Sequence, residues 1–400
     1  MKILVLSTWF PYPPIQGSKI RAYNLIRSLS QQHELALISF RDMEIQDEWI
    51  EHLHCYCKEI IIVEQHPFRY SKIKTWLGFF TILPSAVVAG YSTKMAATVQ
   101  KFAKVWQPDL VFALTFVTAP YALQIPHTNR VVDMDNLLAL MLRDLFKNTQ
   151  GFLQKQRRYW AYWKFKNYEN QIYKKFDLAF VCSNLDKSRA VEYIDLAAEK
   201  IVAIPNGVDS NLTLPQSLPD FNHKLIFNGS LNYWPNYDAM NYFLTEIFPL
   251  ILKKIPDCEI LITGNNENVD IHTLPSHSGK VIFTGFVENI QSLVTSCAAC
   301  VVPLRHGAGT RLKILEAMAA GTPVITTPKG AEGLEVKHGQ HLLIANTPQE
   351  FANLTVQILS DLSLREKIVL EAQRLVENVY DWQVIGMKLN QTIDALLSSR

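Results

Sequence analysis

Residues 300–327 read CVVPLRHGAGTRLKILEAMAAGTPVITT. The apolar, β-branched run at 300–304 predicts a buried strand, and 322–327 predicts a second one. Between them the pattern predicts a helix over 312–320, which Gly321 and Pro323 bring to an end. Strand, glycine loop, helix and strand in this order indicate a βα unit of a parallel sheet covered on both faces.

The loop before this helix has the features of an anion site. Gly307 and Gly309 leave the backbone bare, and a helix N-terminus carries about half a positive charge. Arg311 and Lys313 add two cations where they oppose the helix dipole, by about 0.3–1 kcal/mol each, so a bound anion would offset that cost. Glu316, one turn beyond Lys313, can accept hydrogen bonds from a diol, and a phosphate together with a ribose is a nucleotide. The alternative is a solvated Lys–Glu pair worth about 0.2–0.5 kcal/mol.

The composition is that of an ordinary globular protein. The chain has 400 residues, 48% hydrophobic and 19% charged, which predicts two or three domains with large cores. The net charge of +2 is uneven, because residues 1–200 hold 25 Lys and Arg against 18 Asp and Glu, whereas residues 201–400 hold 14 against 19. This asymmetry points to an acidic partner for the first half, such as lipid phosphate or a membrane surface.

The six cysteines do not suggest a disulfide framework, and a reduced, cytoplasmic setting fits them. Cys297 and Cys300 form a CxxC, but without a second pair at zinc spacing we interpret them as packing residues. We interpret residues 1–10 as a first strand rather than a signal peptide. The hydrophobic run 76–89 is too short, and too broken by proline, to span a bilayer.

The first half of the chain alternates strands with helices. Strands are predicted at 3–7, 34–40, 59–63, 109–114, 130–133 and 177–182, with a first helix at 18–31 capped by Ser18. Such alternation predicts an α/β doubly wound domain with a parallel sheet. No GxGxxG is present, which disfavours a nicotinamide or flavin site. Arg21, one turn into the first helix, either reaches an anion or is solvated.

Two carboxylates follow a predicted strand in VVDMDNL. Asp133 and Asp135 lie at its carboxyl end, where open α/β sheets bind ligands. Either one is a candidate base for an acceptor hydroxyl, and helix capping by Asp135 or Asn136 explains the pattern equally well.

Residues 154–176 are predicted to form one helix with seven Lys or Arg and eight aromatic residues. One interpretation is a long helix whose aromatic stripe packs on the sheet while its cations are solvated. The other is an interfacial helix on anionic lipid, with Trp and Tyr at headgroup level, and the two are compatible. Nothing else in the chain supplies a base-reading module for nucleic acid.

A second βα series begins after the turn in IPNGVD at 204–209 and a Pro-rich stretch that reaches Pro219. Strands are predicted at 225–228, 259–263 and 281–284, with helices at 236–252 and 290–296. We predict an N-terminal doubly wound domain at 1–205, a C-terminal one at 206–380 and a final helix within 381–400.

The stretch GTRLKILEAMAAGTPVI resembles the donor-binding signature of family-4 glycosyltransferases of the group 1 type. IPNGVD is similar to the interdomain hinge of that family. The resemblance covers nearly the whole chain and is most specific in the second half. It implies a GT-B fold, in which two Rossmann-like domains face a cleft and a C-terminal helix crosses back to the first domain.

The resemblance also implies roles for particular residues. Glu316 matches the glutamate that holds the donor ribose, but the glutamate expected eight residues earlier, at the sugar, is Ala308 here. The backbone of 306–310 or the His306 ring could replace it. In many members of the family an Arg and a Lys from the segment that matches NGSLNYWPNYDAM bind the diphosphate. This segment has neither, so the resemblance implies that Arg311 and Lys313 bind the diphosphate instead. The donor-binding residues implied are Gly17, Gly229, Ser230, Gly285, Phe286, Val287, His306, Gly307, Ala308, Gly309, Thr310, Arg311, Leu312, Lys313 and Glu316.

The sequence therefore predicts a retaining glycosyltransferase that moves a sugar from a nucleotide-diphosphate sugar to a glycan or lipid-linked acceptor, as in polysaccharide assembly. Arg311, Lys313, Asp133 and Asp135 are its candidate catalytic residues, and fixed cations make a metal cofactor unnecessary. A cytoplasmic enzyme in peripheral contact with an anionic membrane is expected. The alternatives are an epimerase or hydrolase of sugar nucleotides with the same fold, or a non-catalytic subunit that binds nucleotide sugars.

Overall fold

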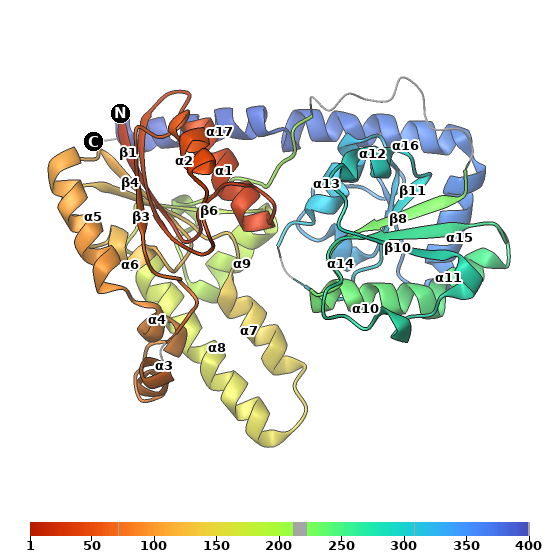
Figure 1. Ribbon diagram of the computed structural model, residues 1–400, viewed down its shortest axis with the longest axis horizontal. Coiled ribbons are helices and arrows are strands. Elements are labelled where there is room, and N and C mark those ends of the chain that lie inside the picture. The colour runs from red at the N-terminus through yellow and green to blue at the C-terminus, as the bar shows by residue number, and fades with distance from the viewer. Residues whose placement is uncertain (71, 211–221, 308, 399–400) are drawn as a thin grey trace. The chain divides into compact units, whose positions relative to one another are not determined.

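The computed structural model describes residues 1–70, 72–210, 222–307 and 309–398. The chain forms two compact units (Figure 1). Unit 1 comprises residues 1–205 together with the end of the chain from residue 385, and unit 2 comprises residues 206–384. Ala308 lies outside the described residues.

Unit 1 contains a seven-stranded parallel sheet in the order β3-β2-β1-β4-β5-β6-β7. Its strands are apolar because helices cover both faces of the sheet. β1 lies between β2 and β4, so the strand order reverses at this point. The strands are β1 Lys2–Ser7, β2 Glu34–Phe40, β3 Glu59–Val63, β4 Leu110–Leu114, β5 Asn129–Asp133, β6 Leu178–Val181 and β7 Ile201–Ala203.

Two helices of unit 1 begin at serine caps. Ser92 and Ser183 cap α5 and α9 by accepting hydrogen bonds from the N–H groups of Met95 and Asp186. In Figure 1, α7 and α8 extend as an antiparallel pair away from the sheet, beside α3 and α4. The helices are α1 Gly17–Leu29, α2 Asp47–His54, α3 Lys72–Phe79, α4 Ser85–Gly90, α5 Thr93–Trp106, α6 Ala119–Ala122, α7 Leu138–Lys147, α8 Phe152–Tyr173 and α9 Asn184–Ile194.

Unit 2 contains a six-stranded parallel sheet in the order β10-β9-β8-β11-β12-β13. Here the order reverses between β8 and β11. The strands are β8 Lys224–Asn228, β9 Glu259–Thr263, β10 Val281–Gly285, β11 Ala299–Val302, β12 Val324–Thr326 and β13 Leu343–Ile344.

One helix predicted in unit 2 is interrupted. Residues 236–252 do not form a continuous α-helix, because a π-helical turn at Phe243–Ile247 separates α10 from α11. Pro249 has no N–H to donate within a regular helix, and the wider turn just before it accommodates this break. The helices are α10 Trp234–Tyr242, α11 Phe248–Leu252, α12 Ile290–Thr295, α13 Leu312–Ala319, α14 Pro328–Ala331, α15 Pro348–Ser360 and α16 Leu362–Leu375, and α17 Trp382–Ser398 ends in unit 1.

The two sheets confirm the predicted α/β doubly wound class. The predicted cap of α1 is wrong, because the N-cap is Gln16, without a side-chain hydrogen bond, and Ser18 lies inside the helix. In the described part of the chain, no helix is long and apolar enough to cross a membrane.

Candidate functional site

The candidate donor residues of unit 2 gather where its strand order reverses. The loop after β8 carries Gly229 and Ser230, and residues 303–307 and 309–311 lie between β11 and the start of α13 (Figure 1). Open α/β sheets bind ligands at the carboxyl ends of their strands, at such a reversal. The sequence-predicted glycines and cations therefore stand where the topology creates a binding site.

The loop between β11 and α13 requires its glycines. Gly307 has a φ of 108° and Gly309 a φ of 80°. Residues other than glycine rarely adopt these backbone angles. The Arg311 guanidinium donates a hydrogen bond from Nη1 to the Gly309 carbonyl. The buried Arg311 side chain thus braces the loop from the position directly before α13.

Lys313, near the start of α13, places its ammonium beside Gly229 and Asn236. Its Nζ donates a 3.0 Å hydrogen bond to Asn236 Oδ1 and lies 4.0 Å from the centroid of the Phe227 ring. Part of the side chain is accessible to solvent, but burial lowers the pKa of its ammonium to about 7, against the opposing effect of the Glu316 carboxylate. A nearby anion would favour the protonated ammonium and raise this pKa.

Gly229 is needed because of Lys313. A Cβ at Gly229 would collide with Lys313 Nζ and would lie 2.9 Å from Asn236 Nδ2. The amide of Asn236 also donates a 2.8 Å hydrogen bond to the Ser230 carbonyl, so it connects the β8 loop to the lysine. Asn236 was not among the predicted site residues.

Glu316 is fixed by a residue that the sequence analysis also missed. Asn228, the last residue of β8, donates a 3.1 Å hydrogen bond from Nδ2 to the Glu316 carboxylate. Burial raises the pKa of this carboxyl group, and Lys313 partly counteracts the rise. A polar residue that ends an otherwise apolar strand was the signal available in the sequence.

His306, between β11 and Gly307, contacts side chains from α10. Its ring stacks at a tilt on Trp234, with 4.8 Å between centroids, and its Nε2 lies 3.8 Å from Asp238. Asp238 also accepts two hydrogen bonds from Arg305, of 2.7 and 3.2 Å. These side chains present an aromatic face and a polar ring next to Gly307.

The third predicted segment of the site lies at the end of the edge strand β10. Gly285 accepts a 2.9 Å hydrogen bond from the N–H of Gly264, and Gly264 packs so closely on Gly229 and Ser230 that a Cβ there would lie 2.7–3.0 Å from their atoms. Gly264 thereby links the β10 end to the β8 loop. Phe286, the next residue, is exposed.

Among the predicted residues of unit 1, Arg21 and Asp133 are buried and paired with each other. Arg21 donates to both oxygens of Asp133, at 2.8 and 2.6 Å, and also to the Ile204 carbonyl at 2.9 Å. Arg21 is not solvated, because its side chain is buried, and the anion that it reaches is the Asp133 carboxylate. Asp135 accepts a 2.6 Å hydrogen bond from Ser18, and burial raises the pKa of its carboxyl group. Gly17 is the first residue of α1.

The capping role considered for Asp135 or Asn136 is taken by another residue. Neither caps α7, whose N-cap is Leu137 without a side-chain hydrogen bond. The first N–H groups of α7 instead donate to the buried Glu169 of α8, at 3.2 and 3.1 Å. Burial raises the pKa of Glu169 to about 8.

Cys297 and Cys300 are buried free thiols, as the packing interpretation predicts. Burial raises their pKa values to about 11 and about 12, so both thiols are protonated at neutral pH. Among the described residues no group of three or more His, Cys, Asp or Glu could hold a metal ion.

Two family models match successive parts of the chain. "Glycosyltransferase Family 4" matches residues 15–212 and "Glycosyl transferases group 1" matches residues 222–361. A 44.6 kDa protein in the cps region of Klebsiella pneumoniae is 23% identical over 389 residues, which cover 95% of this chain and 96% of that protein.

Solved structures share the fold over the whole chain. Sucrose-phosphate synthase from Thermosynechococcus elongatus superposes with a TM-score of 0.74 at 15% identity, covering 100% of both chains. HepE of Anabaena in complex with UDP-glucose gives 0.68 at 18% identity, covering 99% of this chain and 100% of that one. The structural similarities confirm the GT-B fold. The two family matches show that the chain belongs to the family-4, group 1 glycosyltransferases and is a glycosyltransferase.

Proposed function

We propose that this glycosyltransferase takes its sugar from a nucleotide-diphosphate sugar and transfers it, with retention of configuration, to a glycan or lipid-linked acceptor. The observation that carries the proposal is the Lys313 ammonium, held by Asn236 beneath the β8 loop and close to a loop with two glycines at positive φ. The complex of HepE with UDP-glucose, at the same fold, supports a nucleotide sugar as donor.

Lys313 and the N–H groups of the glycine loop would stabilise the diphosphate. Breaking a sugar–diphosphate bond leaves negative charge on the departing phosphate, and fixed cations and N–H dipoles aimed at that charge lower the barrier. We propose that Arg311 contributes by bracing the loop and through its charge. This arrangement would serve the leaving group without a metal ion.

Glu316 would bind the ribose. Its carboxylate is held by Asn228, which leaves lone pairs free to accept hydrogen bonds from two neighbouring hydroxyl groups. The backbone at 285–287, linked to the β8 loop through Gly264, would face the nucleobase. His306, whose ring stacks on Trp234, would contact the sugar. It would replace the glutamate of the family, because Ala308 at that position has no polar side chain.

The acceptor side is proposed for unit 1. Asp135 is the better candidate base, because both oxygens of Asp133 already accept hydrogen bonds from Arg21. The raised pKa of the Asp135 carboxyl also brings it closer to the range in which a general base works. We propose a cytoplasmic enzyme in peripheral contact with an anionic membrane that carries its acceptor.

Donor turnover tests this proposal. The protein is incubated separately with UDP-glucose, GDP-mannose and related donors in the presence of a bacterial lipid extract. Release of the nucleoside diphosphate and the anomeric configuration of the product are followed by NMR. We expect one donor to be consumed, with a product that keeps the donor's anomeric configuration, and Lys313→Ala to slow turnover by about ten- to a hundredfold. Epimerised donor, free sugar alone or an inverted product would contradict the proposal.

A further inference from the structure

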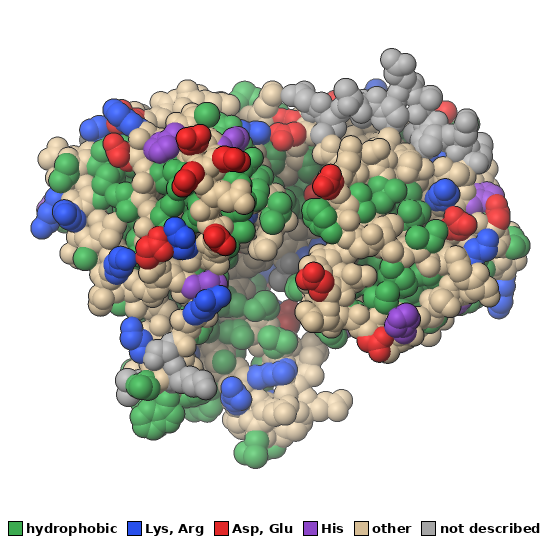
Figure 2. Space-filling view, in the orientation of Figure 1, with side chains coloured by type: hydrophobic (Ala, Val, Ile, Leu, Met, Phe, Trp, Pro, Cys, Tyr) green, Lys and Arg blue, Asp and Glu red, His purple; other side chains and the backbone are tan. Residues whose placement is uncertain are grey.

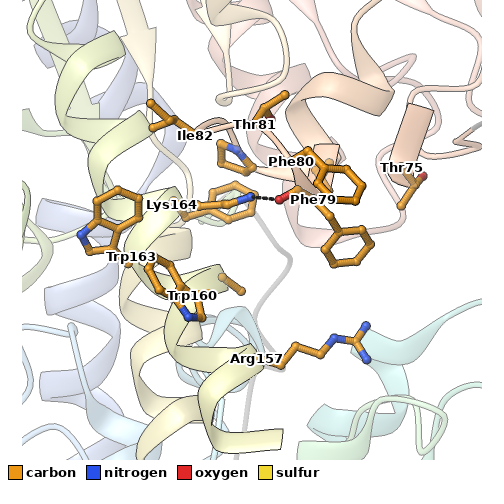
Figure 3. Close-up of a pocket in the computed structure, with 14 residues that line it drawn as sticks. Thr75, Phe79, Phe80, Thr81, Ile82, Arg157, Trp160, Trp163 and Lys164 are labelled. Carbon is orange, nitrogen blue, oxygen red and sulfur yellow. Dashed lines mark hydrogen bonds between the residues drawn. The ribbon is translucent and has the colours of Figure 1, made fainter. Parts of the chain in front are cut away.

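Unit 1 has an apolar groove of about 820 Å³ between the α3–α4 segment and residues 157–165 of α8 (Figure 3). The two sides are joined by Lys164, whose Nζ donates hydrogen bonds of 3.1 Å to the carbonyls of Gly78 and Phe79. The groove is therefore built by side chains that hold the end of α3 against α8. Its apolar lining includes Phe79, Phe80, Ile82, Trp160, Trp163 and Phe165.

The lining is open to solvent. Phe80 is 74% exposed and Trp160 54% exposed, and Figure 3 shows aromatic rings from both sides of the groove facing the same space. Each large apolar side chain left in water forgoes the free energy that its burial would contribute. Contiguous exposed apolar surface of this kind marks an interaction site.

The surroundings of the groove are strongly basic. Residues 65–90 and 138–168 together contain ten Lys or Arg and one acidic residue. Arg157 lies at the rim and, among the described residues, makes no hydrogen bond or ion pair (Figure 3). In Figure 2 Lys and Arg side chains lie beside hydrophobic ones at the end of unit 1 formed by α3 and the α7–α8 pair. The occupant must therefore combine hydrocarbon with negative charge.

We propose that this face is the membrane-docking surface of the protein, with the groove receiving a hydrocarbon chain of an anionic lipid bilayer while Arg157 and its basic neighbours meet lipid phosphates. A second copy of the chain fits less well, because a self-contact would bring two basic faces together. The inference rests on the membrane contact proposed above and assigns it to particular side chains. Aromatic rings at headgroup level and cations beside them are the usual features of such surfaces.

Vesicle flotation with the full chain tests the assignment. The probes are phosphatidylcholine vesicles with and without phosphatidylglycerol, at low and high salt. We expect flotation only with the anionic vesicles, weakened by salt. Phe80→Ser should weaken binding at least about tenfold, and Arg157→Glu at least about fivefold.

Matched controls lie on α5 of the same unit. Val105 is 82% exposed and Lys101 is an exposed cation, and neither lines the groove. Val105→Ser and Lys101→Glu should leave vesicle binding unchanged. Equal losses in the controls would overturn the proposal, because the effect would then belong to general surface character rather than to the groove.

Insertion can be followed separately by tryptophan fluorescence with acyl-brominated phosphatidylglycerol vesicles. Trp160 should contribute to the quenching, so Trp160→Phe should reduce the quenched fraction, whereas Trp234→Phe, an exposed tryptophan of unit 2, should not. Quenching that Trp160→Phe leaves unchanged would contradict insertion at the groove.

A nucleotide-binding measurement on the same samples separates this inference from the donor proposal. If wild-type protein binds a nucleoside diphosphate but not anionic vesicles, the docking surface is wrong and the donor site stands. If it binds vesicles through Phe80 and Arg157 but no nucleotide, the reverse holds. A concentration-dependent dimer that Phe80→Ser abolishes would assign the groove to a second copy and overturn the proposal.

Discussion

Asn228 and Glu316, 88 positions apart in the sequence, are joined by a 3.1 Å hydrogen bond from the Asn228 amide to the Glu316 carboxylate. The bond connects the last residue of β8 to the middle of α13, across the reversal in strand order. It holds the carboxylate in one orientation before any ligand binds. Preorganised hydrogen-bonding groups of this kind increase affinity because little ordering remains to be done on binding.

Asn228→Ala should therefore weaken donor binding without removing the carboxylate. We expect the dissociation constant to rise about tenfold, from the loss of one hydrogen bond to a charged group. Isothermal titration calorimetry with the preferred nucleoside diphosphate measures it. Asn353→Ala, at an exposed position on α15, serves as the control and should bind like wild type.

Gly229→Ala should damage the same site by displacing Lys313. The new methyl group would occupy the place of Lys313 Nζ, and φ at Gly229 is not in the glycine-only region, so the contact rather than backbone strain is tested. We expect donor affinity to fall at least about tenfold, since a charge-assisted hydrogen bond is worth about 1.5–3 kcal/mol. Unchanged affinity would mean that Lys313 does not act from its observed position.

Donor binding should take up a proton above neutral pH. Burial lowers the pKa of Lys313 to about 7 in the empty site, so at pH 8 most molecules carry the neutral amine. A bound diphosphate favours the ammonium and raises this pKa, so affinity should decline as pH rises through and above about 7. Calorimetry at pH 8 in buffers with different ionisation enthalpies measures the proton uptake, and Lys313→Arg should abolish it.

The same lysine affects folding in the opposite direction. In the absence of donor, the unfolded chain holds the Lys313 proton up to its ordinary pKa of 10.5, whereas the folded protein releases it near 7. Between these values the unfolded state binds more protons, so this group makes the free energy of unfolding rise with pH. Urea denaturation of wild type and Lys313→Met across this window should differ in slope.

The Arg21–Asp133 ion pair should be structural. Both side chains are buried, and removing one partner leaves an uncompensated charge, so Arg21→Met should lower the free energy of unfolding by about 3–5 kcal/mol. The exposed Lys58–Glu34 pair is the comparison, and Lys58→Met should change stability by about 0–1 kcal/mol. Urea denaturation measures the free energy of unfolding of both variants. Equal decreases in the two variants would contradict a structural role for the Arg21–Asp133 pair.

The sequence was sufficient where local pattern determines structure. Strands such as β2 and β3 have the predicted bounds because runs of apolar residues, ended by polar ones, mark buried parallel strands. The loop between β11 and α13 was recognised because glycines and cations at a helix start are an unusual local combination. These features depend on neighbouring residues only.

Interactions between distant residues were not predictable in the same way. Asn228 is one of many asparagines until the sheet places it beside Glu316, and Arg21 meets Asp133 only because α1 packs against the end of β5. For residues 154–176 the packing interpretation holds for one half of the helix, and the interfacial interpretation stays a prediction. The second half of α8 packs Phe165, Tyr168 and Ile172 into the core, whereas its first half is exposed. The sequence shows the aromatic residues of this helix, but it does not show which of them are buried by the rest of the fold.

The central claim is that Lys313 and Glu316 form the site of a nucleotide-diphosphate donor. The most direct measurement is the shift in thermal unfolding temperature of the full chain with UDP, GDP, ADP, CMP and TDP, repeated on Glu316→Ala. Stabilisation by one nucleotide that disappears in the variant is the predicted result, because a ligand that binds only the folded state raises its stability. No shift with any nucleotide, or an equal shift in Glu316→Ala, would contradict the assignment.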